Sequence, residues 1–185
     1  MALIEAHDTR LMKTGGGILY AAPWVGETPP EEADFVDRGN SPGISFSLQI
    51  TKLKHNSMRT GTKTVDKTKV TERGYTLKFK LDELSQTNLA LLVGGTVDGN
   101  TIHAMTDVEA QWALRFIENN GSGAENITWN WWKCTIAPDG DTNLISLDNF
   151  KEMSFTAEGL DDSANHPESA TDSPFWDMDF VEPTV

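Results

Sequence analysis

The chain has a single cysteine, Cys134, and its 185 residues contain no long apolar run. One cysteine excludes an intrachain disulfide, and Cys134 lies in an apolar stretch where we expect a small buried side chain. No run approaches the length that spans a membrane. The N-terminus also lacks the charged and apolar regions of a secretion signal. We therefore expect a protein that folds in a reducing cytoplasm and has no membrane partner.

Basic residues are scarce, with 15 Lys and Arg against 28 Asp and Glu and a formal net charge of -13. A protein that grips nucleic acid needs a basic footprint, because phosphate contacts supply most of the affinity. The chain as a whole lacks one. Nine of the fifteen bases lie between Thr51 and Lys80, whereas the residues from Pro138 onward hold one base, Lys151, against twelve acids. This asymmetry favours contact between the basic middle of one copy and the acidic end of another.

Signatures of chemistry are missing as well. The four histidines, His7, His55, His103 and His166, are far apart in the sequence, and none lies in a metal-ligand motif. The sequence has no phosphate-binding loop and no nucleophile elbow. We therefore predict no catalytic, cofactor-binding or metal-binding residue, no cofactor and no enzymatic activity.

Alternating apolar residues mark the clearest strands. They run from Ile44 to Ile50 and from Tyr75 to Leu81. Directly after the second strand, Ser85 is suited to begin a helix and Gly94-Gly95 to end it, which predicts one helix over about residues 85–93. Further strands are expected at 18–25, within 102–118, at 127–136, 150–160 and 174–181, with a hairpin loop at 119–124.

The segment ITWNWWKCTI, residues 127–136, shows a conflict of parity. Ile127, Trp129 and Trp131 fall on one face of a regular strand, and Trp132 and Cys134 fall on the other. A β-bulge near Trp131 and Trp132 resolves the conflict, and so does burial of both faces. Large aromatic residues favour a core or interface position over a ligand platform.

These elements predict one domain over residues 1–185, mainly β. We expect a β-sandwich or partly closed barrel with one flanking helix. A long inter-strand loop over about 51–74 and extended terminal arms complete it. Within that loop, Thr62 to Val70 alternates weakly, which is compatible with an extended hairpin arm. Residues 1–17 form the N-terminal arm, and residues 161–185 form a C-terminal arm or last strand.

The polar 51–74 segment has little to bury, so a role in contact with other copies is predicted for it. Its candidate contact residues are basic: Lys52, Lys54, His55, Arg59, Lys63, Lys67, Lys69 and Arg73. The complementary candidates are acids near the C-terminus: Asp161, Asp162, Glu168, Asp172, Asp177 and Asp179.

Three segments resemble the major tail tube proteins of long-tailed, non-contractile bacteriophages. The first is a strand followed by a basic segment, FSLQITKLKHNSMRTGTKTVDKTKV. The second is a strand that runs into a helix, YTLKFKLDELSQTNLALLVGG. The third is WNWWKCTIAPDGDTNLISLDNFKEMSFTAEGL, with a turn between two strands. Together they cover roughly residues 44–160.

The resemblance implies a structural virion protein without catalytic activity. In that family a β-sandwich flanked by a helix forms hexameric rings, and the rings stack into the tail tube through which the genome passes. The resemblance further implies that the long loop reaches the adjacent ring and that the terminal arms act at ring contacts. The expected partners are other copies of the chain, the tape measure, tail terminator and distal tail proteins. DNA passes through without specific binding, and the location is the virion tail, after assembly in the host cytoplasm.

Other functions remain open at this stage. A tube component of a contractile tail or secretion machine shares the same broad architecture, and a capsid decoration protein is a further possibility. A carbohydrate-binding β-sandwich module could use Trp129, Trp131 and Trp132 as a stacking platform for sugar rings.

Overall fold

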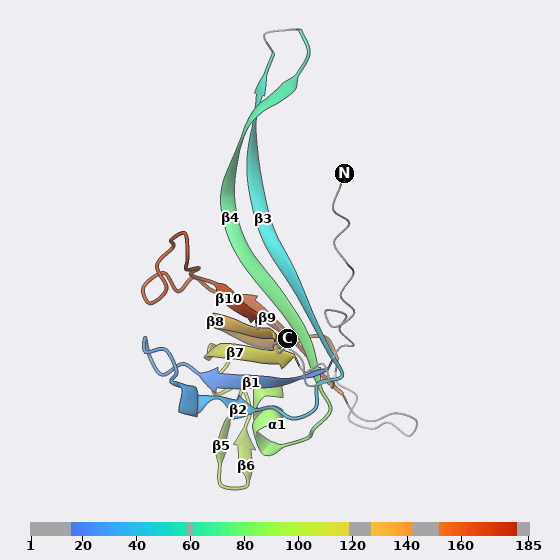
Figure 1. The fold of residues 1–185 in the computed structure, drawn as a ribbon. Helices are drawn as coiled ribbons and strands as arrows, with labels where there is room; N and C mark the ends of the chain where they lie inside the picture. Colours follow the sequence, from blue (N-terminus) through green and yellow to red (C-terminus); the bar gives the residue numbers. More distant parts are fainter. Residues whose placement is uncertain (1–15, 59–60, 119–126, 142–151, 181–185) are drawn as a thin grey trace, which may run out of the picture.

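The computed structural model describes residues 16–58, 61–118, 127–141 and 152–180. These residues form a mainly β fold with one α-helix, which confirms the predicted fold class (Figure 1). The strands before the helix are β1 (Gly17–Pro23), β2 (Val36–Asp37), β3 (Gly43–Ser57) and β4 (Thr64–Leu81), and a short 3-10 helix, η2, covers Glu32–Asp34. Helix α1 (Gln86–Leu92) is followed by β5 (Thr96–Asp98), β6 (Thr101–His103), β7 (Gln111–Glu118), β8 (Ile127–Pro138), β9 (Met153–Gly159) and β10 (Trp176–Phe180).

Eight of these strands form one antiparallel sheet. Seven follow the order β2-β1-β7-β8-β9-β4-β3, and β10 pairs with the first part of β8, on the side where β9 pairs with the rest of β8. Strands β5 and β6 form a separate small hairpin. Because β2 and β3 stand at the two ends of the path and do not pair, the sheet curls without closing into a barrel. Side chains from its concave side form the core, led by Trp131, Tyr75 and Phe155.

The prediction of a long loop at 51–74 is wrong, because most of that segment is strand. Residues Leu48 to Ser57 of β3 pair with Tyr75 to Thr64 of β4, interrupted by two register shifts. Six of the 24 residues of segment 51–74 are Thr, which favours extended backbone. Both of its faces are exposed, so no apolar alternation was needed to form it, and its sequence therefore resembles that of a loop.

Helix α1 begins and ends as the sequence predicts. The Ser85 hydroxyl accepts a hydrogen bond from the Asn88 backbone N–H at 3.2 Å. At the other end Gly94 has a φ of 55°, and the N–H of Gly95 reaches the carbonyl of Ala90 at 2.9 Å. This is the left-handed glycine cap that such helix ends require. The helix packs beside β5, β6 and β8, at the end of the molecule opposite the tip of the β3–β4 hairpin (Figure 1).

A β-bulge in β8 resolves the parity conflict of the tryptophans. Trp112 of β7 lies opposite Cys134, but Leu114 lies opposite Trp131, so β8 contains one extra residue at this point. Trp131 and Cys134 are consequently both buried in the core. Of the two explanations drawn from the sequence, the bulge is the one that the fold uses.

The predicted last strand is present as β10, within the segment 174–181. Residues 1–15 of the expected N-terminal arm, the expected hairpin loop at 119–124 and residues 181–185 of the C-terminal segment lie outside the described residues.

Candidate functional site

The β3–β4 hairpin projects far beyond the rest of the sheet (Figure 1). Pairing of β4 with β9 ends at Thr76, so from Leu48 and Tyr75 outward the two strands pair only with each other. Ten residues of β3 at roughly 3.3 Å each give this ribbon a length of about 30 Å. An isolated two-stranded ribbon is at best marginally stable in water and leaves both outer edges with unpaired backbone groups.

Apolar side chains along this ribbon face solvent. Leu53 is 65% exposed, and Met58, next to the tip, is 69% exposed. Others that are exposed are Leu48, Ile50, Val65 and Val70. Such a row on a projecting element is a common mark of an interaction surface.

Charge pairing changes along the hairpin. At its base, Arg73 bonds Glu168, Lys78 bonds Asp139 and Lys80 bonds Glu152, each at 2.5–2.7 Å. Farther out, His55 pairs with Asp66 at 2.6 Å. The predicted contact residues Lys52, Lys54, Lys63, Lys67 and Lys69 are all exposed and make no ion pair with any residue that the structure describes. Arg59 lies outside the described residues.

The predicted acidic contacts serve mainly their own chain. Glu168 is held by Arg73, whose guanidinium lowers the pKa of this carboxyl through a hydrogen bond and its charge. Asp172 lies 3.5 Å from His166. Asp162 is only 3% exposed and accepts a bond from Asn165, so it stabilises its loop and is not available to another copy. Asp161 accepts a bond from the Ser163 hydroxyl.

Asp177 and Asp179 belong to a polar network on the outer face of the sheet. The Asn130 side chain donates to Asp177 at 2.9 Å and to Asp179 at 3.4 Å, and it accepts from Arg115. Partial burial raises the pKa of Asp177. Arg115 in turn bonds Glu32, so this network joins β7, β8, β10 and η2.

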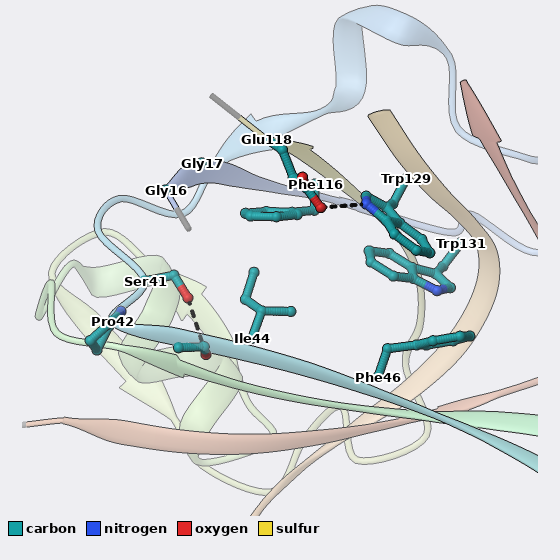
Figure 2. A pocket seen from close by; sticks show the side chains of 11 residues that line it. Gly16, Gly17, Ser41, Pro42, Ile44, Phe46, Phe116, Glu118, Trp129 and Trp131 are labelled. Carbon is teal, nitrogen blue, oxygen red and sulfur yellow. Dashed lines mark hydrogen bonds between the residues drawn. The ribbon is translucent and has the colours of Figure 1, made fainter. Parts of the chain in front are cut away.

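A cavity of about 440 Å³ lies at the opening of the curled sheet, between the starts of β1, β3 and β8 and the end of β7. Figure 2 shows Phe46 and Ile44 facing Phe116 and the two tryptophans across this space. Its lining is mainly apolar, and the Trp129 indole N–H donates to Glu118 at 2.9 Å. The Trp129 and Trp131 rings stack with their centroids 6.0 Å apart.

The three tryptophans of the sugar-platform hypothesis do not share one surface. Trp131 is buried, and Trp129 stacks on it with Phe46 close by. Trp132, next to Trp131 in the strand, points to the opposite face of β8, where its ring stacks on the His166 ring with the centroids 4.0 Å apart. A sugar ring cannot contact all three, which weakens the carbohydrate-binding alternative.

Within the described ranges, no three His, Cys, Asp or Glu side chains gather as a metal ion would require. The α-helix in the described ranges, α1, has seven residues. None of the described helices is long and apolar enough to cross a bilayer.

No contact surface was predicted from the sequence at the end of the molecule formed by α1, β5 and β6. Between Lys80 and Arg115 there is no Lys or Arg, and this stretch forms α1, β5 and β6. The sequence signal for this surface was the lack of Lys and Arg directly after the most basic segment of the chain.

Comparison with known proteins adds a family but no activity. No curated protein matches the chain. Residues 13–107, which include the whole β3–β4 hairpin, α1, β5 and β6, match a family described as Protein of unknown function UCP028589. The match covers just over half of the 185 residues, and the chain belongs to this family of unknown function.

Proposed function

We propose that this protein is a structural subunit that assembles with copies of itself into a tube. The tube is of the kind built by the major tail tube proteins of long-tailed, non-contractile bacteriophages. In this proposal the chain is a virion tail protein, its rings stack, and the genome passes through the lumen. The tape measure, tail terminator and distal tail proteins are its further partners.

The projecting β3–β4 hairpin is the observation that carries the proposal. It exposes apolar side chains, free strand edges and five lysines that form no ion pair with the described residues. From Leu48 and Tyr75 outward, Tyr75 is its one member of the core cluster formed by the described residues. Another protein surface can cover the apolar groups and pair with the edges. A contact between two different surfaces of identical copies repeats without limit, or closes into rings, as tube assembly requires.

The charge of the chain agrees with a conduit for DNA. The net charge of -13 opposes tight binding of phosphates, which would stall a passing genome. The basic residues that could hold DNA are concentrated in the hairpin, and a contact between copies would cover them.

The test shortens the hairpin and asks whether assembly fails while folding survives. Residues 52–71 are replaced by Asn-Gly, which links the paired residues Thr51 and Glu72 through a favoured hairpin turn. This variant keeps the Arg73–Glu168 ion pair and every core residue. We expect hollow tubes or rings of the full chain by negative-stain electron microscopy at rising concentration. We expect only folded monomers of the shortened chain.

A matched variant of full length, L53T/V65T/V70T, separates the apolar contacts from the length of the hairpin. Threonine keeps the strand preference and removes the apolar ends. Assembly should weaken without a change in circular dichroism. Tubes formed by the shortened chain would contradict the proposal, and an unfolded shortened chain would show that the hairpin belongs to the folding unit.

A further inference from the structure

The end of the molecule formed by α1, β5, β6 and the loop 104–110 is acidic and free of bases. From Leu81 to Leu114 the chain contains five acids and no Lys or Arg: Asp82, Glu83, Asp98, Asp107 and Glu109. Asp98, Asp107 and Glu109 are exposed and form no ion pair with the rest of the described chain. We name this part, residues 82–110, the acidic end.

Backbone hydrogen bonds hold the acidic end together as a compact unit. The N–H of Met105 bonds the carbonyl of Val93, and the N–H of Asp107 bonds the carbonyl of Gly94, both at 2.9 Å. Strand β5 pairs with β6 from Thr96 to His103. Exposed apolar groups and exposed acids therefore lie close to each other on a fixed surface.

The apolar groups at this end are prominent. Met105 is 78% exposed and Val108 is 60% exposed, and Val93 and Val97 are exposed beside them. Met105 is also the one described residue other than glycine with a positive φ, 59°. Residues other than glycine rarely adopt a positive φ, and such backbone conformations cluster at functional sites.

We infer that the acidic end of one copy is the surface that receives the β3–β4 hairpin of the next copy. The inference rests on the proposed function, because it names the surface that the assembly uses. Both surfaces carry exposed apolar residues. The hairpin adds lysines, and the acidic end adds acids, that form no ion pair with the described residues. The two surfaces lie at opposite ends of the molecule (Figure 1). Contact between them is head-to-tail and leaves both ends of every dimer open for further copies.

The acids near the C-terminus fit this role less well. Glu168 and Asp172 already face Arg73 and His166 of their own chain, and Asp162 is buried. Asp177 and Asp179 accept bonds from Asn130. The hairpin lysines need acids that are not already paired, and among the described residues the acidic end supplies Asp98, Asp107 and Glu109.

A charge-exchange experiment tests the inference. One variant, D98K/D107K/E109K, makes the acidic end basic. A second variant, K52E/K54E/K67E/K69E, makes the hairpin acidic. Each variant alone brings like charges together, so we expect the concentration needed for assembly to rise at least about tenfold. An equal mixture of the two restores opposite charges at every contact, so assembly should return.

Crosslinking locates the contact directly. Cys134 is fully buried, so a cysteine introduced at the surface is the reactive one. A mixture of K54C and D98C, treated with a short bismaleimide, should give a dimer band that neither variant gives alone. K54C mixed with S169C, in the C-terminal acidic loop, is the matched control.

The outcomes separate the inference from the proposed function. Assembly that survives the reversal of the acidic end, or crosslinking to S169C in place of D98C, overturns the inference and leaves the tube intact. A wild-type protein that stays monomeric at every concentration contradicts the proposed function and, with it, the inference.

Discussion

Arg73 and Glu168 form a two-point ion pair that ties the base of the projecting hairpin to the loop before β10. The two guanidinium nitrogens donate to the two carboxylate oxygens at 2.5 and 2.7 Å. The Arg73 side chain also lies over the Phe175 ring, 5.9 Å from its centroid. Two parallel bonds fix direction as well as distance, so this pair sets the point from which the free part of the hairpin extends.

Replacement of Glu168 by Gln is expected to lower the melting temperature in a pH-dependent way. The folded pKa of Glu168 is below its usual 4.5, because Arg73 stabilises the charged form. Its contribution is therefore present above the unfolded pKa and is lost as the pH falls through the lower folded pKa. The melting temperatures of wild type and E168Q should differ at pH 7, and the difference should shrink once the pH falls below the usual glutamate pKa and toward the lower folded pKa.

High salt should reduce the difference in melting temperature between wild type and E168Q at pH 7, because the Arg73 and Glu168 side chains are about half exposed and salt screens their attraction. Glu158→Gln, on β9 and without an ion pair among the described residues, serves as the control. A gap that stays constant from pH 7 to pH 3 would contradict an electrostatic role for the pair.

Replacement of Phe155 by Ala should destabilise the fold by about 3–5 kcal/mol, as expected for a large core residue. Phe155 is fully buried and stacks on Phe79 with ring centroids 5.1 Å apart. Urea unfolding followed by tryptophan fluorescence measures the change. Phe180→Ala, at a position that is 46% exposed, should change the free energy of unfolding by no more than about 0.5 kcal/mol. Equal effects of the two substitutions would contradict the assignment of the core.

The Cys134 thiol should resist labelling in the folded protein. It is fully buried, burial raises its pKa, and the thiolate is the reactive form. Its S–H also donates to the Trp112 carbonyl at 3.3 Å. We expect reaction with Ellman's reagent at pH 8 to be roughly a thousandfold slower than in urea, since labelling requires the fold to open. Rapid labelling of the native protein would show that β7 and β8 separate easily near the bulge.

Replacement of Asp177 by Asn is expected to leave the melting temperature unchanged or to raise it at pH 7. Partial burial raises the folded pKa of Asp177, so the protonated side chain favours the folded state. This stabilisation is complete below the unfolded pKa and is lost as the pH rises through the folded pKa. Asparagine avoids that loss and keeps an oxygen that can accept from Asn130. The advantage of D177N should shrink as the pH falls toward 4. A large loss of stability at pH 7 would mean that the charge itself is needed; Asp141→Asn, an exposed change, is the comparison.

The parts of the fold that local chemistry determines could be predicted. The cap at Ser85, the glycines at 94 and 95 and the bulge near Trp131 each follow from a residue type at a fixed position. The weak alternation of Thr62 to Val70 pointed to an extended arm, but the full length of the hairpin was hidden, because both of its faces are exposed and show little apolar alternation beyond Ile50. Its length follows from pairing between the strands, which a pattern along one strand does not contain.

The candidate contact residues were only partly predictable for a related reason. The abundance of lysine in 52–69 is plain in the sequence, but which lysines lack a partner depends on folding. The C-terminal acids looked available because the sequence from Pro138 onward holds one base, Lys151, against twelve acids. Folding brings Arg73 and Asn130 to them from distant segments, and His166 lies six residues from its partner Asp172.

Strand β8 pairs with β7 along one side, and with β10 and then β9 along the other. During synthesis, β7, β8 and β9 leave the ribosome before Trp176 to Phe180 can pair. Until then the edge of β8 from Ile127 to Trp131 is open and bears unsatisfied backbone groups. A polypeptide that stops before β10 keeps this edge unpaired, so premature termination is expected to yield aggregates and substrates for proteolysis.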